Sequence, residues 1–278
     1  MGGMTQMQEE QTEMNRPDVR LTDMNQTEMS QADTEQTEEK RIRLNQSGES
    51  LAETVPGKGL CGSTLKILAV LSMIVDHWCY LFAEQGTEVY EIGRMWIGRL
   101  AFPIFCFLLV EGFQKTGNRK KYGQRLLLFA FLSEIPFDLF RYGKVFSMEG
   151  CNIFVTLFLG FLLMAATEYV TGWEMSEIRK AVSRLLALLL AVGAAYLIHS
   201  DYNFYGVISI YILYMFRYQK RQQLMMGALS FLYEPTALAA FVPIALYNGR
   251  RGLKIKYFFY LFYPVHLLVL YLVAQLLH

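Results

Sequence analysis

The chain has 278 residues, of which 53% are hydrophobic and 18% charged, and its formal net charge is +1. The apolar residues are gathered in several long runs, which excludes an ordinary soluble domain and indicates an all-α, polytopic transmembrane bundle. The charge is uneven, because residues 1–58 hold 12 acidic and 6 basic residues whereas the remaining 220 hold 13 and 20. We therefore expect an acidic tail followed by a basic membrane domain.

Residues 1–58 repeat a loose unit, as in QTEM and LTDM, and are almost free of aromatic side chains. Such a segment cannot bury enough apolar surface to offset its ordering entropy, so the composition predicts a disordered tail. The membrane domain then comprises residues 59–278. The four cysteines show no paired spacing, which argues against a disulfide framework or a zinc site.

The apolar runs predict about seven full spans plus a short helical hairpin. In chain order the spans are 65–82, 96–113, 126–140, 152–166, 185–198, 204–216 and 257–276. Residues 222–247 are interrupted at Glu234 and Pro235, and a hairpin there keeps the basic residues at 250–256 inside, as the positive-inside tendency requires. The basic link at 114–125 places the N-terminus in the cytoplasm, and the expected location is the cell membrane.

The first run carries Lys66 at its start and Asp76 and His77 well inside. Ionisable groups at membrane depth cost several kcal/mol, so by default they mark a functional site. Lys66 and His77 are eleven residues apart, which on a helix is a rise of roughly 16 Å and a rotation of about 20° beyond three turns. They share one face at a separation comparable to an extended phosphopantetheine arm, with a cation for phosphate at one end and an imidazole for a thioester at the other.

Two other interpretations stay open for this helix. Lys66 can snorkel to the interface, and His77 with Asp76 can form a satisfied buried pair. Neighbouring residues on a helix point about 100° apart, so Asp76 cannot easily orient His77 directly. We expect the orienting partner of His77 on another helix.

More polar residues fall at membrane depth than a passive scaffold needs. They are Arg99, Glu111, Glu134, Asp138, Asn152, Asp201, Glu234 and His266. Glu134 and Asp138 are four residues apart, so a cation from Arg99 or Arg141 is expected between them. A divalent metal would also fit, but no histidine cluster supports one and no metal site is expected. A charge-paired kink at Pro136 and a role in contacting substrate are equally compatible with the pattern.

Three of these residues have two interpretations each. Asp201 precedes a helix and is expected to cap it, with an inward orientation toward His77 as the alternative. Glu111 either belongs to the site or pairs with a loop lysine, and His266 is either a core hydrogen-bonding group or a second candidate histidine. The chain has no Gly-rich nucleotide loop and no GxSxG or CxxC motif, which argues against hydrolase, ATPase and redox functions.

Several segments resemble one family closely. They are LKILAVLSMIVDH, IGRLAFPIFCFLLVEGFQKTGNRKKYGQRLLLFAFLSEIPFDL, CNIFVTLFLG, SDYNFYGV and FYLFYPVHLL. Together they are similar to the TraX family, named for acetylating the N-terminus of conjugative pilin, and through it to the acyltransferase-3 membrane acyltransferases. That wider group shares a basic residue, ten intervening residues and a histidine on an early helix, a pattern that falls here on Lys66 and His77.

The resemblance implies a membrane-bound acetyltransferase that uses acetyl-coenzyme A as donor and a pilin-like N-terminus or a cell-surface glycan as acceptor. His77, beside Asp76, would act as general base or take the acyl group itself. Lys66 would hold the donor phosphates with help from Arg119, Lys120, Lys121 or Arg125. Arg99, Glu111, Glu134, Asp138, Asn152, Asp201 and His266 are candidates for orienting the histidine or binding the acceptor.

The expected partners are membrane lipids, acetyl-coenzyme A and the acceptor protein or glycan, and no nucleic acid is expected. A different class of protein also fits the buried carboxylates, namely a small transporter or flippase that relays protons. No inverted internal repeat is detectable, which counts against that alternative.

Overall fold

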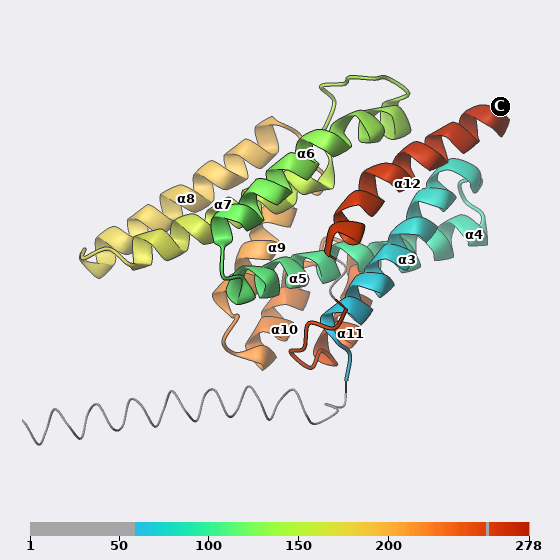
Figure 1. Cartoon of the computed structure of the whole chain (residues 1–278). Coiled ribbons are helices and arrows are strands. Elements are labelled where there is room, and N and C mark those ends of the chain that lie inside the picture. The colour runs from blue at the N-terminus through green and yellow to red at the C-terminus, as the bar shows by residue number, and fades with distance from the viewer. Residues whose placement is uncertain (1–58, 254–255, 278) are drawn as a thin grey trace, which may run out of the picture. The chain divides into compact units, whose positions relative to one another are not determined.

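The computed structural model describes residues 59–253 and 256–277, and these ranges fold as packed helices (Figure 1). The predicted disordered tail at residues 1–58 lies outside the described residues. The longer helices are α3 (Gly62–Phe82), α5 (Ala101–Lys115), α6 (Arg119–Tyr142), α7 (Ile153–Thr171), α8 (Glu177–Leu197), α9 (Asn203–Met215), α10 (Lys220–Ser230) and α12 (Lys256–Leu277). The shorter ones are α4 (Glu88–Tyr90), η1 (Glu91–Ile97), η2 (Gly98–Leu100), η3 (Pro235–Ala240) and α11 (Phe241–Ala245).

Five helices in the described part of the chain are long and apolar enough to cross a membrane: 62–82, 88–115, 153–171, 177–197 and 257–277. The predicted count of seven spans is not reached, although all seven predicted runs fall in helices. Charged residues interrupt α6, and α9 has only 13 residues. The predicted break is confirmed, since α10 ends at Ser230 and the next helical segment, η3, begins at Pro235.

Two segments expected to be loops are helical because a polar residue caps each of them. Asn118 accepts a hydrogen bond from the Lys121 amide at 2.8 Å, so α6 begins at Arg119 and the basic residues of the predicted link occupy its first two turns. Ser176 caps α8 through the Arg179 amide. Capping of this kind satisfies amide donors that the first turn of a helix leaves unpaired.

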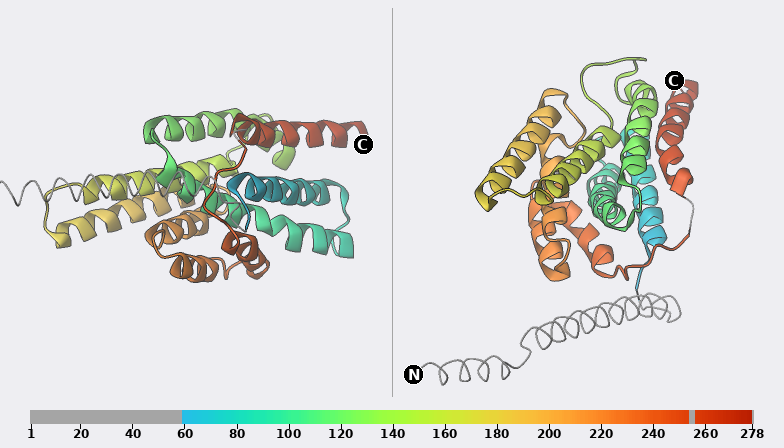
Figure 2. Two further views of the ribbon diagram at one scale, coloured as in Figure 1. Left: turned by 60° about the horizontal axis from the view of Figure 1, so that its bottom comes forward. Right: turned by 60° about the vertical axis from the view of Figure 1, so that its left-hand side comes forward.

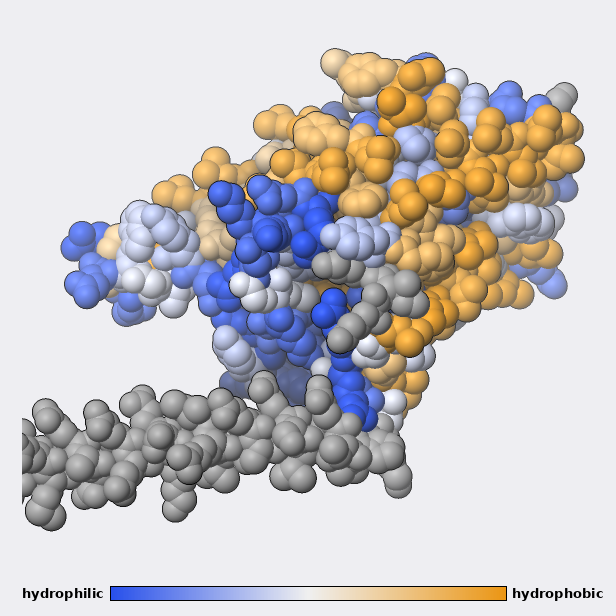
Figure 3. Space-filling model, viewed as in Figure 1, coloured by the Kyte–Doolittle hydropathy of each residue, from blue (hydrophilic) through white to orange (hydrophobic). Residues whose placement is uncertain are grey.

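Helix α5 lies in the middle of the described helices (Figure 2, right) and packs against α3, α7 and α9. Phe102, Ile104, Phe107, Val110 and Phe113 on this helix are at most 3% exposed. On α8, by contrast, only Ala195 is buried. Figure 3 shows a broad apolar surface over α12 and α3 and a hydrophilic area where α5 ends and α6 begins. An apolar outer surface is what contact with lipid requires.

The start of α3 is bonded to the loop that follows α11. The Gly62 amide donates to the Arg250 carbonyl at 2.7 Å, and the Ser63 amide donates to the Arg251 carbonyl at 3.0 Å. These carbonyls satisfy amides that a helix N-terminus leaves without intrahelical partners. The contact places Arg251 beside the first turn of the helix that carries Lys66.

The other half of α3 packs closely on η1 and η2. A Cβ atom at Gly98 would lie 2.5 Å from Asp76 Oδ1, so only glycine permits this approach. Element η1 is a π-helix, a form that is rare and frequent at functional sites. The Ser72 hydroxyl donates to the Ile97 carbonyl at 2.5 Å, which adds a bond between the two segments.

Candidate active site

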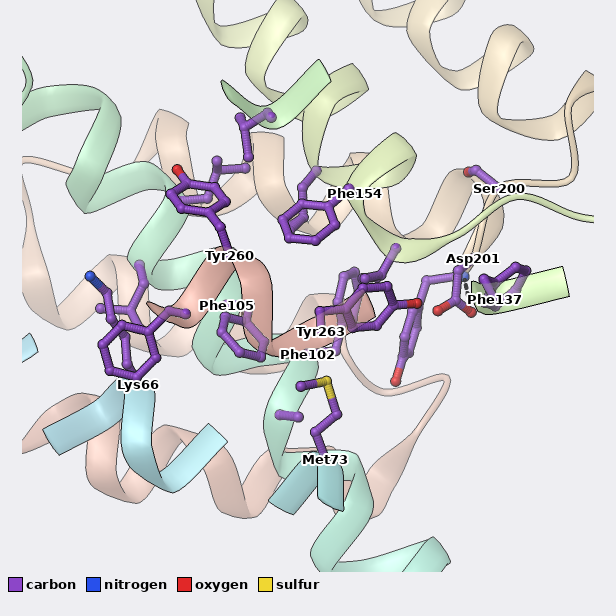
Figure 4. Close-up of a pocket in the computed structure, with 18 of the residues that line it drawn as sticks. Lys66, Met73, Phe102, Phe105, Phe137, Phe154, Ser200, Asp201, Tyr260 and Tyr263 are labelled. Atoms are coloured by element: carbon purple, nitrogen blue, oxygen red, sulfur yellow. Dashed lines mark hydrogen bonds between the residues drawn. The ribbon is translucent and has the colours of Figure 1, made fainter. Parts of the chain in front are cut away.

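A large cavity of about 980 Å³ runs between the helices. Figure 4 shows Lys66 at one end and Asp201 at the other. Aromatic side chains form the wall between them: Phe102, Phe105, Phe154, Tyr260 and Tyr263. Lys66 and His77 both line the cavity, as their spacing on one helix face predicted. The cavity thus has a polar site at each end and an apolar middle.

Cations gather at the Lys66 end: Lys66, Lys115, Lys121, Arg125 and Arg251 line the wall there. Lys115 is neutralised by Glu111 at 2.6 Å, which is the lysine pairing weighed for that carboxylate. The Lys66 ammonium lies 5.4 Å from the centre of the Phe259 ring and makes no ion pair within the described residues. The Arg125 Nε atom is buried without a hydrogen-bond partner. This end therefore carries more positive charge than its surroundings neutralise.

A second histidine contacts His77 at the other end of the cavity. His77 Nδ1 lies 2.7 Å from His266 Nε2, and the rings stack with centroids 4.9 Å apart. His266 Nδ1 lies 3.0 Å from the Phe262 carbonyl oxygen. A carbonyl only accepts, so His266 Nδ1 carries a proton and, in the neutral ring, His266 Nε2 accepts one from His77 Nδ1. His77 Nε2 is left as the basic nitrogen of that ring.

The expectation of a partner on another helix is met by this contact, because His266 belongs to α12. Asp76 Oδ2 lies 3.8 Å from His77 Nε2, too far for a hydrogen bond but close enough to stabilise an imidazolium. Asp76 is itself bonded to Arg94 at 3.3 Å. His266 does not belong to the cavity wall and stands behind His77, where it can position the ring without touching a ligand.

Asp201 also lines this end of the cavity, so its predicted capping role is wrong and the inward alternative holds. The residue at the cap of α9 is Tyr202, whose φ of 60° is left-handed. His199 and Asn203 are left-handed too, with φ of 49° and 48°. Non-glycine residues keep such angles only where their surroundings fix them, often at functional sites. Burial raises the pKa of Asp201 to about 6, while Arg141 acts in the opposite direction.

Several predicted site residues lie away from the cavity. Arg119 bonds Glu168 at 3.4 Å, and Lys120 is exposed and outside the wall. Glu134 accepts hydrogen bonds from the amide and the side chain of Asn152, which also caps α7.

Asp138 accepts the Ser147 amide at 2.8 Å. The predicted cation between Glu134 and Asp138 is wrong, since neither carboxylate has an ion pair within the described residues and Arg99 instead pairs with Glu234 at 3.2 Å. Two backbone amides and the amide side chain of Asn152 replace the cation as partners without adding a buried charge, although Asp138 Oδ1 is buried without a hydrogen-bond partner.

The cavity wall includes Arg141, which was expected beside Glu134 and Asp138 instead, and three basic residues that the sequence did not single out as site residues: Arg94, Lys115 and Arg251. Arg94 and Arg141 are separated in the chain, yet both guanidinium groups lie 4.8 Å from the centre of the Tyr80 ring. Such contacts between cations and aromatic faces are stabilising. Spacing along one helix cannot reveal them, because they join residues from different elements. No group of three or more His, Cys, Asp or Glu side chains within the described ranges could hold a metal ion.

Comparison with known proteins adds the family. The family model described as TraX protein matches residues 61–274. A probable fimbrial assembly protein, FimC of serogroup H1 from Dichelobacter nodosus, is 30% identical over 236 residues, which cover 74% of this chain and 92% of the relative. No solved structure matches the chain. Because the family match extends over nearly the whole described region and includes both ends of the cavity, the chain belongs to the TraX family.

Proposed function

We propose that this protein is an acetyltransferase of the cell membrane, with its N-terminus in the cytoplasm, that transfers acetyl from acetyl-coenzyme A to an amine or hydroxyl acceptor. The name of the fimbrial relative supports a role in pilus assembly, and the family supports one in conjugation. A pilin-like N-terminus or a cell-surface glycan is therefore the proposed acceptor. The main support is that one cavity joins unneutralised cations to a histidine with a free basic nitrogen.

The cation end fits the phosphates of the donor. Lys66 makes no ion pair in the described part of the chain, and Arg125 has a buried Nε without a partner. Both are suited to phosphate oxygens, with which cationic donors form strong hydrogen bonds. Lys121 and Arg251 add charge to the same end. The aromatic middle of the cavity would surround the less polar pantetheine arm.

The histidine end fits general base catalysis. Acetyl-coenzyme A supplies, when bound, the thioester carbonyl carbon that the acceptor attacks. His77 Nε2 takes one proton from the attacking nitrogen or oxygen as the new bond to carbon forms, and returns it to sulfur as the C–S bond breaks. The products are the acetylated acceptor and a free thiol, with His77 neutral again. Asp76 stabilises His77 while it is charged.

The test uses detergent-purified protein with labelled acetyl-coenzyme A, comparing the wild type with His77→Ala. We expect both proteins to bind the donor and only the wild type to release free coenzyme A slowly. Loss of a general base lowers the rate by about 10²- to 10⁴-fold. A folded wild type that binds no donor would refute the proposal and favour the transporter, which uptake driven by a pH gradient in vesicles would then test.

A further inference from the structure

The charged side chains near His77 form two ion pairs across helices. Asp76 on α3 bonds Arg94 on η1 at 3.3 Å, and Arg99 on η2 bonds Glu234 at 3.2 Å. Each of these four residues lines the cavity, and each has a partner of opposite charge. Burying a charge is tolerated when it is paired in this way. These two pairs therefore hold the wall together and are neutral overall, although the Oε2 atom of Glu234 is left without a hydrogen-bond partner.

Two charged residues of the same wall have no such partner. Glu149, another carboxylate of the wall, is not one of them, because it is bonded to Lys144 at 2.9 Å. Arg141 and Asp201 line the cavity but form no ion pair within the part of the chain that the structure describes. One is a cation and the other a carboxylate, so a ligand between them would meet both signs of charge.

Both residues are held in position by contacts that do not neutralise them. The Arg141 guanidinium lies 4.8 Å from the centre of the Tyr80 ring. The Asp201 amide donates to the Cys151 carbonyl at 2.9 Å, and the Asp201 carbonyl accepts the Thr156 hydroxyl. The two charges are close enough for Arg141 to lower the pKa of Asp201, yet farther apart than an ion-pair contact. Both residues line the cavity that His77 also lines.

We infer that the acceptor of the proposed acetyl transfer is zwitterionic, with an amine that pairs with Asp201 and a carboxylate or phosphate that pairs with Arg141. A ligand with one charge would leave the other residue unpaired, and complementary charges of both signs are what selects such a group. Glu234 supports the assignment, because its Oε2 atom is buried without a hydrogen-bond partner and offers the ammonium a second acceptor. This inference rests on the proposed function only for the reaction, not for the binding.

The position suits the reaction. An ammonium at Asp201 loses one proton before attack and a second as the C–N bond forms, and His77 is the basic group of the same cavity. The C–S bond breaks, the thiol leaves with one proton, and one proton is released per acetyl transferred. The carboxylate or phosphate at Arg141 takes no part in bond making and fixes the orientation of the amine.

The experiment measures binding to the detergent-purified full chain without any acyl donor. The probes are ω-amino acids from glycine to 6-aminohexanoate, the alkylamine and the carboxylate of each length, and the matching aminoalkylphosphonates. We expect one length of zwitterion to bind about 10- to 100-fold more tightly than either singly charged analogue, because each lost charge-assisted bond weakens binding by that order. The phosphonates tell whether Arg141 prefers a phosphate-like anion to a carboxylate.

The variants divide the site into its two halves. Arg141→Gln should remove the advantage of the zwitterion over the amine, and Arg141→Lys should keep part of it. Asp201→Asn should remove the tighter binding of the zwitterion relative to the analogue that carries only the carboxylate. Arg179→Gln is the control, since it removes an exposed cation that does not line the cavity, and it should change neither of these two preferences.

Equal binding of zwitterions and singly charged analogues at every length would overturn the inference. So would a preference that persists in Arg141→Gln and Asp201→Asn, or an effect of Arg141→Gln on coenzyme A release without any effect on zwitterion binding. Release of coenzyme A from acetyl-coenzyme A is measured separately. Zwitterion binding without that release would refute the acetyltransferase and leave the zwitterion site standing.

Discussion

His266 Nε2 accepts a hydrogen bond from His77 Nδ1 at 2.7 Å, and the carbonyl of Phe262 fixes the direction of that bond by accepting from the other nitrogen of His266. The two rings are nearly parallel, with an interplanar angle of 18°. A backbone carbonyl thus sets the tautomer of His77 through an intervening histidine. A residue that hydrogen-bonds a catalytic group from behind fixes the orientation of that group.

Removing His266 should impair turnover more than binding. His266→Ala leaves His77 free to rotate and to place its proton on either nitrogen, so we expect kcat to fall about 10- to 100-fold with little change in KM for the donor. His266→Gln should recover part of the rate, because its side-chain oxygen can accept from His77 Nδ1. The pH profile of kcat is the second measurement, and it should change in His266→Ala. If kcat falls equally in His266→Ala and His266→Gln and its pH profile does not change, His266 serves only in packing.

Gly98→Ala should disturb the carboxylate beside His77. The added Cβ would lie 2.5 Å from Asp76 Oδ1 and 2.7 Å from Asp76 Cβ, so the side chain or the helix must move. We expect a loss of about 1–3 kcal/mol in stability, as overpacking of close contacts usually costs, together with a lower kcat. Thermal unfolding in detergent measures the first effect and coenzyme A release the second.

Gly193→Ala on α8 is the control for that substitution, since nothing lies within 4 Å of its added Cβ. Alanine there should stabilise the helix by about 0.5–1 kcal/mol. If Gly98→Ala behaves like Gly193→Ala, the close approach of η2 to α3 is less tight than its geometry indicates.

Lys66 and Arg251 should govern affinity for the donor. Changing either residue to alanine removes a cation from that end of the cavity, so we expect the Kd for coenzyme A to rise about 10- to 100-fold. Lys66→Arg should retain most of the affinity, since the charge stays. Arg179→Ala removes an exposed cation outside the cavity and should leave the Kd unchanged. Calorimetry at two salt concentrations measures these values, and a wild-type Kd that does not depend on salt would contradict a phosphate site.

Asp201 should make stability depend on pH. Burial raises its pKa to about 6, whereas Arg141 and Arg99 lower it and Asp76 raises it further; the Tyr202 amide also favours the charged form. A carboxyl whose folded pKa is raised stabilises the fold at a pH below its unfolded value of about 3.9, and this contribution is lost as the pH rises through about 6. Asp201→Asn should therefore raise Tm relative to the wild type more at pH 7 than at pH 4.5. A difference in Tm that is the same at both pH values would mean that the pKa of Asp201 is not raised in the folded protein.

The sequence by itself determined the class of fold, the family, the break at Pro235 and the position of Lys66 and His77 on the same face of one helix. The family follows from the resemblance of the quoted segments, and the other features follow from apolar runs, from proline and from the helical repeat, which act over short distances along the chain. Spacing along α3 also indicated that Asp76 cannot orient His77.

Only the tertiary structure decided which residues meet. His266 reaches His77 from a helix 189 positions away in the chain, and the turn around Asp201 directs its carboxylate into the cavity instead of onto α9. The partner of Arg99 is Glu234 and not the two carboxylates of α6, which accept hydrogen bonds from amides at the cap of α7 and in its preceding loop. Ion pairs and hydrogen bonds depend on distances of a few ångströms between different helices, and no local pattern in the chain encodes those distances.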